Sequence, residues 1–327
     1  MKEIVVKKTH EITEAEWQDI AIGFNEEFKK EKTPADLLRF YRANFKGYSY
    51  HGLAKDEHGV LAGFTSVNPT EYSGAGGDTF FAGLSGSTFV RKDFRNDIFV
   101  FHHIYKSLRL ACAADGCKVI LGVPNKNSFK YVVKLLGFKF LYNLPYHVLP
   151  VRVKNIFENK LIKLASGFIY LLIWLYAKLT GFISLLYNPK EKKAAFNILF
   201  SDETYRLRFN ESYKIINDGL WQFTYRVYEE KNIRTAYLFD FRQNGQRSFR
   251  GLSKAVNHII ANERIDMIAF VGTMKIKQPL LMQLPKSKEP QALPLTIDIL
   301  VAETDPMFTA CTKAENWNFG LMNFDVR

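Results

Sequence analysis

Residues 91–95 carry three basic side chains, Arg91, Lys92 and Arg95, between an expected strand at 79–90 and an expected helix at 98–114. The first backbone N–H groups of a helix have no intrahelical acceptor, and the helix dipole adds partial positive charge there. Such a turn favours an anion, and guanidinium groups pair well with phosphate oxygens. This spacing therefore predicts a phosphate-binding turn.

Proton transfer needs a titratable group within reach of the reacting atom, and the sequence offers several. Glu71 and Asp78 flank a Ser-Gly-Ala-Gly-Gly loop at 73–77, which can close over a substrate or form a solvated hairpin. His102 and His103 are adjacent in the expected helix, so at most one of them faces a given site. Tyr131 is a candidate acid. We take Asp78, Glu71 and Tyr131 as catalytic candidates, although each also has an ordinary structural role open to it.

Capping and breaker residues delimit the elements that hold these groups. Thr13 and Glu16 form a Thr-x-x-Glu capping box for a helix at 14–29, and Thr33-Pro34 opens a second helix. The pattern then predicts strands at 49–54, 60–67 and 79–90, a helix at 98–114, a strand at 118–123, a helix at 127–136, and strands at 138–143 and 146–153. This order predicts an α/β domain with a mixed sheet flanked by helices.

Between residues 80 and 138 the sequence resembles the GNAT (Gcn5-related N-acetyltransferase) superfamily. The resemblance lies in the strand FFAGLSGSTFV, the turn RKDFRND, the strand VILGVPN and the segment NSFKYVVKLLGF. It implies that the first strand lines the pantetheine arm of acetyl-CoA or another acyl-CoA, and that the turn holds the pyrophosphate. The positions that match these binding segments are Val90, Arg91, Arg95, Asn96, Asp97, Ile98, Asn125, Asn127 and Ser128.

The turn departs from the family's pattern. Where Arg-Gly-x-Gly is usual, this sequence has Arg95, Asn96, Asp97 and Ile98. Glycine lets the backbone approach a phosphate without a Cβ in the way, and Asp97 either adds unfavourable charge or caps the helix. The family's tyrosine, which protonates the leaving thiolate, aligns with Val133. These departures keep open a second interpretation, a catalytically degenerate binding module with the same fold.

The second half of the chain repeats the order of long strand, basic turn, helix and buried strand, from 233 to 271. We therefore predict two GNAT-like domains, at 1–153 and 195–327, joined by an apolar, basic helical connector at 154–194. Trp221 and Tyr225 share one face of an expected strand. With Arg242 they are candidates for a sugar or nucleotide cleft, or else core aromatic residues beside surface arginines.

The connector contains an apolar run, residues 167–187, with Lys178 as its single charge. Smaller and polar residues recur along it near helical spacing, which indicates a helix with two unequal faces. Three interpretations follow: a buried helix between domains, an interfacial membrane helix, or a transmembrane span. Residues 151–195 hold eight basic and two acidic side chains, a net +6. This charge fits contact of 155–190 with an anionic membrane, and it also fits a solvated surface.

The net charge of +12 and the pI near 9.4 indicate an acidic partner. Nucleic acid is not expected, because no expected helix has a dense basic face. The three cysteines form no ligand cluster, so we expect no metal site and a reducing compartment. The N-terminal residues show no secretory signal. We expect a cytoplasmic protein, associated with the inner face of the membrane if the connector binds lipid.

The function that these features favour is acetyl transfer from acetyl-CoA to the amine of a small molecule, without a metal. The Pro-Asn-x-x-Ser segment resembles bacterial proteins of surface-polysaccharide synthesis, which implies an amino sugar, including a nucleotide-linked one, as acceptor. The first alternative is the degenerate binding module at the membrane face. The second is an aminoacyl or peptidyl transferase, like the tandem-GNAT enzymes that use a charged tRNA or a lipid-linked acceptor.

Overall fold

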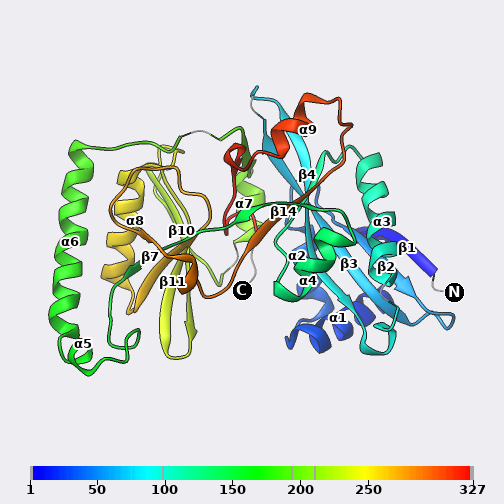
Figure 1. Cartoon of the computed structure of the whole chain (residues 1–327), viewed down its shortest axis with the longest axis horizontal. Coiled ribbons are helices and arrows are strands. Elements are labelled where there is room, and N and C mark those ends of the chain that lie inside the picture. The colour runs from blue at the N-terminus through cyan, green and yellow to red at the C-terminus, as the bar shows by residue number, and fades with distance from the viewer. Residues whose placement is uncertain (1–2, 75, 98, 193, 210, 325–327) are drawn as a thin grey trace. The chain divides into compact units, whose positions relative to one another are not determined.

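The computed structural model describes residues 3–74, 76–97, 99–192, 194–209 and 211–324 (Figure 1). The chain divides into two compact units, and each unit is assembled from three segments of the chain. Unit 1 comprises Met1–Asn143, Ala195–Arg208 and Ala292–Trp317. Unit 2 comprises Leu144–Ala194, Phe209–Gln291 and Asn318–Arg327.

Unit 1 is built on a mixed sheet in the order β1-β2-β3-β4-β5-β14-β6, with β8 paired to β3 and β15 paired to β8. Along the main path only β4 and β5 run parallel. The strands are β1 (Glu3–Lys8), β2 (Tyr50–Lys55), β3 (Leu61–Ser73), β4 (Thr79–Val90), β5 (Val119–Gly122), β6 (Lys139–Asn143), β8 (Phe196–Leu199), β14 (Pro294–Ile299) and β15 (Trp317–Asn318).

Helices cover both faces of this sheet. On one face, α1 (Glu14–Phe28) and α2 (Pro34–Arg42) pack through Trp17, Tyr41 and Phe64. On the other face, α3 (Phe99–Ala114) and α4 (Lys126–Lys134) pack through residues such as Tyr105 and Val132. Thr13 and Thr33 cap α1 and α2 with complete capping boxes, which confirms the two predicted helix starts. Two short helices, α7 (Asp202–Arg208) and α9 (Pro306–Cys311), also belong to unit 1.

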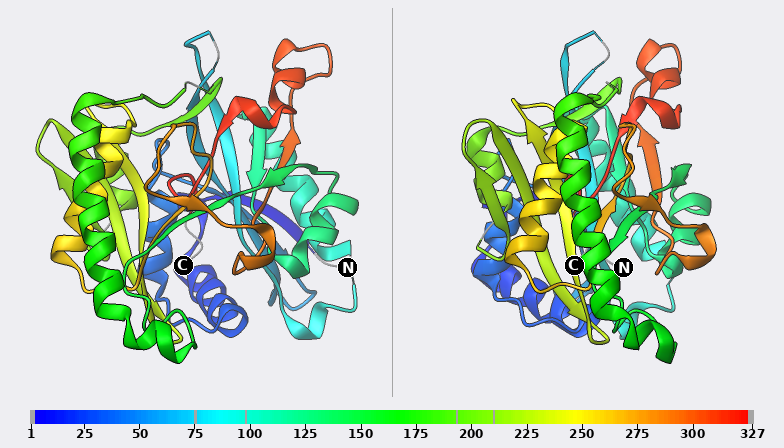
Figure 2. Two further views of the ribbon diagram at one scale, coloured as in Figure 1. Left: turned by 60° about the vertical axis from the view of Figure 1, so that its left-hand side comes forward. Right: turned by 90° about the vertical axis from the view of Figure 1, so that its left-hand side faces the viewer.

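Unit 2 is built on a second mixed sheet, in the order β13-β7-β12-β11-β10-β9. Here β11 and β12 run parallel and the other neighbours are antiparallel. The elements are β7 (Tyr146–Pro150), α5 (Lys160–Leu164), α6 (Ser166–Leu186), β9 (Lys214–Asn217), β10 (Trp221–Glu230), β11 (Ile233–Gln243), α8 (Phe249–Asn262), β12 (Met267–Val271) and β13 (Met282–Gln283). The helix α8 packs on β10 and β11, and α6 packs on α8 (Figure 2).

Each half of the chain contributes to the sheet built mainly from the other half: the first half supplies β7 to one sheet, and the second half supplies β8, β14 and β15 to the other. The strand expected at 146–153, predicted to close the first sheet, instead pairs as β7 with β12 and β13 in unit 2. The strand β14, from the second half of the chain, pairs with β5 and β6 in unit 1. Local pattern cannot distinguish these arrangements, because an antiparallel neighbour has the same alternation whichever segment supplies it. The predicted α/β class with two mixed sheets is confirmed, and the compact units cross the ranges 1–153 and 195–327.

A buried polar cluster holds β14 beside β5. The Asp298 carboxylate accepts hydrogen bonds from the Tyr105 hydroxyl at 2.8 Å and from Arg109 Nε at 2.7 Å. Asp298 is buried, and burial together with this carboxylate raises the pKa of Tyr105 well above its usual range. The cluster therefore fixes a strand that is 189 residues away in sequence from Arg109.

The helix α6 is long and apolar enough, by length and composition, to cross a membrane. Of its 21 residues, only Ala177, Thr180 and Ser184 are buried. Most of its large apolar side chains, including Phe168 and Leu179, are exposed, whereas Tyr170, Ile173 and Trp174 are partly buried against the core of unit 2. A fully buried connector helix, one of the three interpretations of this segment, is therefore not what the structure shows.

Candidate functional site

The strands β4 and β5 diverge at the point where the sequence predicted a ligand groove. They pair only from Ala82 to Leu84, and β4 then continues to Val90 while β5 ends at Gly122. A bulge with Ser87 at φ 46° re-aims this part of β4. A Cβ added at Gly86 would meet no atom within 4 Å. No described strand pairs with residues 85–90 on the β5 side, so this open edge can accept an extended chain that carries amides.

The turn after β4 satisfies most of its own backbone donors. It forms a 3-10 helix at Lys92–Phe94, in which the amides of Phe94 and Arg95 donate to the Arg91 and Lys92 carbonyls. The Asp97 amide donates to Phe94, and the Asp97 carboxylate accepts from the Phe99 amide at 3.0 Å. Asp97 therefore caps α3, as one of its two interpretations held. Ile98 lies outside the described residues.

The two arginines of the turn are paired with carboxylates of α1. Arg95 binds Glu27 and also donates from Nε to the Val90 carbonyl at 2.9 Å. Arg91 Nε lies 3.6 Å from Glu26 Oε2. A phosphate at this turn would have to compete with both glutamates. Because the Arg95–Glu27 pair is partly solvent-exposed, it is worth only about 0.2–1 kcal/mol and can be displaced. The Arg91 side chain is only 21% exposed, and its Nε has no hydrogen-bond partner among the described residues.

The start of α4 forms a self-contained cap. Asn125 Oδ1 accepts hydrogen bonds from the Asn127 and Ser128 amides, at 3.0 and 2.9 Å. The Ser128 hydroxyl also contacts the Asn125 side chain, at 3.0 Å. These three residues follow the end of β5 in the chain, and their part in binding acyl-CoA stays a prediction. The Asn96 position lies in the same turn as Arg95.

The catalytic candidates do not gather around this open edge. Asp78 is exposed in the hairpin before β4, at the end opposite to the turn, and the 12 residues of β4 span roughly 40 Å. Glu71 on β3 pairs with Phe81, four positions or roughly 13 Å before Ser85. Tyr131 on α4 is mostly exposed. None of the three is brought to the divergence of β4 and β5.

Sequence analysis missed a row of buried polar side chains on the face of β3 that α1 and α2 cover. Ser66, Asn68 and Thr70 alternate along β3, and Asn68 pairs with Leu84 at the point where β4 and β5 diverge. Asn68 Oδ1 is buried and has no hydrogen-bond partner among the described residues. A buried polar atom of this kind calls for a partner, which a water molecule or a ligand group can supply. The available signal was the polar alternation, but the predicted strand ended at residue 67.

Tyr41 of α2 lies beside this row, near the hydroxyls of Ser87 and Ser66. It is fully buried, and burial raises its pKa to about 12. The phenol therefore stays protonated at neutral pH and can donate a hydrogen bond but cannot act as a general base. The neighbouring His51 is also buried, and burial lowers its pKa to about 3, so it stays neutral.

In unit 2 the three candidate substrate residues do not form one cleft. Tyr225 is buried in the core, and its hydroxyl donates to Glu263 at 2.9 Å. Trp221 lies on the same face of β10, half-buried against Arg250 and Lys254 of α8. Arg242 pairs across the sheet with Gln222, so strand alternation places it on the opposite face from Trp221. The sugar or nucleotide cleft predicted for Trp221, Tyr225 and Arg242 is therefore not formed by these three residues.

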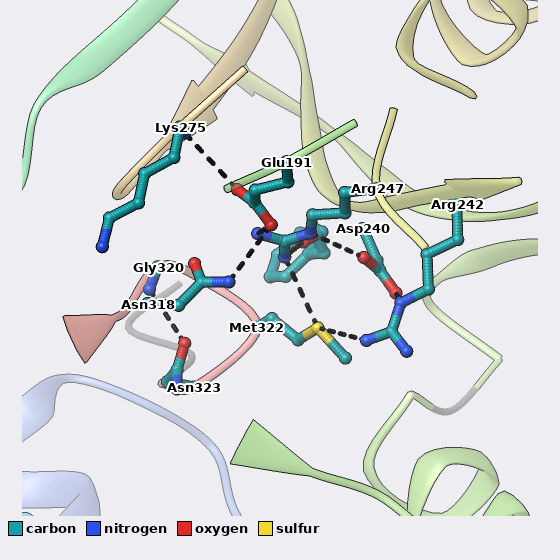
Figure 3. Close-up of polar contacts among 10 residues, drawn as sticks. Glu191, Asp240, Arg242, Arg247, Lys275, Asn318, Gly320, Met322 and Asn323 are labelled. Atoms are coloured by element: carbon teal, nitrogen blue, oxygen red, sulfur yellow. Dashed lines mark hydrogen bonds and ion pairs between the residues drawn. The ribbon is translucent and has the colours of Figure 1, made fainter. Parts of the chain in front are cut away.

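Arg242 instead belongs to a buried ion-pair cluster at the end of β11 (Figure 3). The fully buried Asp240 carboxylate lies between Arg242 and Arg247, with Nε to oxygen distances of 2.7 and 3.0 Å. Met322 Sδ accepts from both arginines, at 3.7 and 3.6 Å. The segment that contains Met322 also pairs along the end of β12, through Leu321 N and Val271 O. In unit 2 the C-terminal segment that contains Met322 therefore lies beside the end of β11 and the end of β12.

No protein-family model matches this sequence, and no curated protein sequence matches it. Solved structures do. A probable N-acyltransferase of unknown function from Enterococcus faecalis V583 matches with a TM-score of 0.57 and 10% identity, over 91% of this chain and 73% of that chain. A GCN5-related N-acetyltransferase from Anabaena variabilis matches with a TM-score of 0.57 and 7% identity, over the same shares. Eis1 from Mycobacterium abscessus matches with a TM-score of 0.53 and 10% identity, over 92% and 74%.

The chain has a GNAT-like fold. At these identities the likeness concerns the fold alone, and because it covers 91% of the chain it includes both units. The parallel pair β4 and β5, with α3 between them, is the part of this GNAT-like fold that carries the open strand edge. The described residues hold no group of three or more His, Cys, Asp or Glu side chains arranged for a metal ion.

Proposed function

We propose that this protein is an acyl-CoA-dependent N-acyltransferase that transfers an acetyl group to the amine of a small molecule. One observation supports this proposal above the others: the open edge of β4 ends in a basic turn at the start of α3, within a GNAT-like fold. The edge offers unpaired backbone groups to the amides of a pantetheine arm. The turn offers Arg91 and Arg95 to its phosphates.

The acyl-CoA co-substrate supplies an activated thioester, and the protein holds the amine and the thioester next to each other. In direct transfer the amine nitrogen forms a bond to the acyl carbon and the carbon–sulfur bond breaks. The proton that the nitrogen loses ends on the leaving thiolate, which departs as the free thiol of coenzyme A. We propose that the amine reaches the thioester from the face covered by α1 and α2. There Asn68 Oδ1 can accept a hydrogen bond from the amine, and the Tyr41 hydroxyl can donate one.

The test is calorimetric titration with acetyl-CoA of three variants beside the wild-type protein. Arg95→Gln removes one phosphate partner and should weaken binding by roughly tenfold, as expected for a lost charge-assisted hydrogen bond of about 1.5 kcal/mol. Glu27→Gln removes the competing carboxylate and should tighten binding by roughly twofold to fivefold. Arg39→Gln, at an exposed site on α2, is the matched control and should change nothing.

This test is specific because Arg95→Gln and Glu27→Gln should change the affinity for acetyl-CoA in opposite directions. A merely structural Arg95–Glu27 pair would predict that both substitutions act in the same direction, through stability. If acetyl-CoA gives no heat with the wild-type protein or with Glu27→Gln, the acyl-CoA proposal fails. Binding that is unaffected by Arg95→Gln would move the phosphate site away from this turn.

A second candidate function, a catalytically degenerate binding module, is favoured by a different observation. The amides of Arg95, Asp97 and Phe99 already have acceptors, and Arg91 and Arg95 already have carboxylate partners. A turn satisfied in this way does not need an anion. Absence of acetyl-CoA binding in all four proteins would favour this function.

For the acceptor we propose an amino sugar, free or nucleotide-linked, as the sequence resemblance suggested. Acetyl-CoA turnover assayed with a panel of amino sugars tests this, and an Asn68→Ala variant should raise the KM for the amine more than for acetyl-CoA. The aminoacyl or peptidyl transferase alternative predicts tRNA binding instead, which a filter-binding assay measures. No contact in the described residues favours that alternative over the first proposal.

A further inference from the structure

The helix α6 has its two faces arranged in the opposite way from an ordinary surface helix. Its small and polar residues face the protein: Ala177, Thr180 and Ser184 are buried. Asn257 of α8 donates to the Ala177 carbonyl at 2.8 Å, and a Cβ at Gly181 would lie 3.4 Å from the same amide nitrogen. Small residues thus bring α6 close to α8. The predicted helix with two unequal faces is confirmed.

The large apolar residues of α5 and α6 form one exposed stripe, which we call the outer stripe. Its members are Leu161, Leu164, Phe168, Leu171, Leu172, Leu175, Leu179, Phe182 and Leu186. Apart from the adjacent Leu171 and Leu172, they recur every three or four positions, and at 100° per residue the α6 members named here fall within a sector about 100° wide. The exposed Leu185 lies just outside this sector. Leu164 is 87% exposed, Phe182 62% and Leu186 80%. A stripe of this size on a soluble surface marks an interaction site.

Basic residues lie before, within and after this stripe in the sequence. Between residues 152 and 192 the described chain has seven basic side chains and two acidic ones, so the net charge is 7 − 2 = +5. One of the two acids, Glu191, is within 3.9 Å of Arg247, so its charge is already compensated. Lysine is depleted in the core of protein–protein interfaces, but it is favoured beside an apolar helix face on an anionic membrane. Charge therefore argues for lipid over a second copy of the chain.

A basic pocket lies beside the start of α6. Arg152, Lys154 and Arg264 line a pocket of about 520 Å³ together with Ser166, Gly167 and Tyr170. An adjoining pocket of about 300 Å³ shares these three basic residues and adds Arg234. The Arg152 guanidinium lies 5.1 Å from the centre of the Tyr170 ring, which holds it in place.

The charge of this pocket is not neutralised by the acids around it. Among the described residues, Arg152, Lys154 and Arg264 form no ion pair. One carboxylate, Asp266, lines the adjoining pocket, but it is buried and already accepts hydrogen bonds from the Arg234 amide at 2.8 Å and from Asn155 at 3.2 Å. Three cations converging on an open pocket favour a phosphate group, which arginine pairs with in two-point geometry.

We propose that α6 lies in the plane of an anionic phospholipid bilayer, with the outer stripe in the acyl-chain boundary and the Arg152, Lys154 and Arg264 pocket on a lipid phosphate. A transmembrane arrangement is disfavoured because the inner face of α6 is already packed on α8, and Tyr176 donates to the Pro279 carbonyl at 2.8 Å. The stripe gives affinity, and the pocket gives the preference for negative lipid. This proposal is independent of acyl-CoA binding.

The test is flotation of the purified full chain with neutral phosphatidylcholine vesicles and with vesicles that also contain phosphatidylglycerol. The wild-type protein should float with the anionic vesicles and much less with the neutral ones. A Phe168→Ser, Leu175→Ser, Phe182→Ser variant should lose binding to both. These side chains are exposed, so the circular dichroism spectrum and the thermal midpoint should not change.

A second variant tests the basic pocket at the start of α6. Arg152→Gln with Arg264→Gln should weaken binding to anionic vesicles by roughly 25-fold, from about fivefold for each charge near the surface, and should leave binding to neutral vesicles unchanged. The matched controls are Arg39→Gln with Arg206→Gln, and Phe40→Ser, Leu110→Ser with Leu207→Ser, all at exposed sites in unit 1. Both controls should float like the wild-type protein.

Four results would overturn the proposal. The stripe variant could float as well as the wild-type protein. The pocket variant could keep its preference for anionic lipid, or the pocket could bind inorganic phosphate in a wild-type protein that ignores vesicles. Finally, sedimentation without lipid could show a dimer that the stripe substitutions convert to a monomer, with no vesicle binding, which would assign the stripe to a second copy of the chain.

Discussion

Single residues in the candidate site owe their chemistry to partners that lie far away in sequence. The position of Arg95 after β4 predicts a phosphate ligand. Its partner in the structure is instead Glu27, which lies 68 residues earlier in the sequence. Asn68 looks like an ordinary strand residue in the sequence, yet its side-chain oxygen is buried and has no hydrogen-bond partner in the described part of the chain. It lies opposite Leu84, where β4 and β5 diverge. The identity of a residue sets what it can do, and its neighbours decide what it does.

Glu16 gives the clearest prediction at this scale. Burial alone would raise its pKa, but hydrogen bonds from Lys55, Lys7 and the Thr13 amide hold it at about 2, against an ordinary 4.5. Because the folded-state pKa is depressed, the stabilisation is fully present above about pH 4.5 and is lost as pH falls towards 2. The shift corresponds to about 3 kcal/mol. Glu16→Gln should remove this acid-sensitive part of the stability.

Urea unfolding measured from pH 2.5 to pH 7 checks the prediction. Wild-type and Glu16→Gln proteins should differ most at neutral pH and converge at the acid end. Glu14→Gln, in the same first helical turn but exposed, is the control and should follow the wild-type curve. A constant difference between Glu16→Gln and wild type at every pH would contradict the assignment.

At the scale of elements, the positions of β14 and α6 follow from side chains that face inward. β14 lies between β5 and β6 because its residues are buried on both faces and because Asp298 pairs with α3. The helix α6 lies on α8 because small residues line one of its faces. In both cases the inward-facing residues decide which element becomes the neighbour.

Asp298→Asn should loosen β14. The substitution keeps the shape but removes the charge that Arg109 and Tyr105 bind, so we expect a loss of about 2 kcal/mol in the free energy of unfolding. Hydrogen exchange should also speed up at amides of β14 such as Ile297. A double variant with Arg109→Gln should lose less than the sum of the two single losses, because the two residues are coupled. Additive losses would mean that the pair does not hold the strand.

At the scale of the whole molecule, the exchange of strands makes each half of the chain depend on the other. A fragment of residues 1–153 lacks β14, so one edge of β5 and the β6 strand would lose their partner. A fragment of residues 195–327 lacks β7, the neighbour of β12. Unpaired buried backbone groups are costly, so neither fragment should fold cooperatively alone.

Thermal unfolding followed by circular dichroism tests this dependence. Each fragment alone should show no cooperative transition, whereas the full chain should show one. Adding a peptide of residues 292–317 to the 1–153 fragment supplies β14 and should restore part of the protection of β5 amides from exchange. A sharp transition in the 1–153 fragment alone would show that β14 is dispensable.

The sequence by itself determined the local elements of this protein. The caps at Thr13 and Thr33, the strand at 79–90, the turn that follows it and the two unequal faces of α6 all depend on residues within a few positions of each other. Interactions between residues a few positions apart can be predicted from the spacing of residue types along the sequence. They were therefore sufficient to predict the α/β class.

Only the tertiary structure decided which strands share a sheet and which partners the site residues have. The exchange of β7 and β14, the pairing of Arg91 and Arg95 with α1, and the separation of Trp221 from Arg242 all join segments that are distant in sequence. Such pairings depend on the packing of complete elements, and alternation along one strand does not specify them. For the same reason, the outward direction of the large apolar residues of α6 became visible only once α8 was in place.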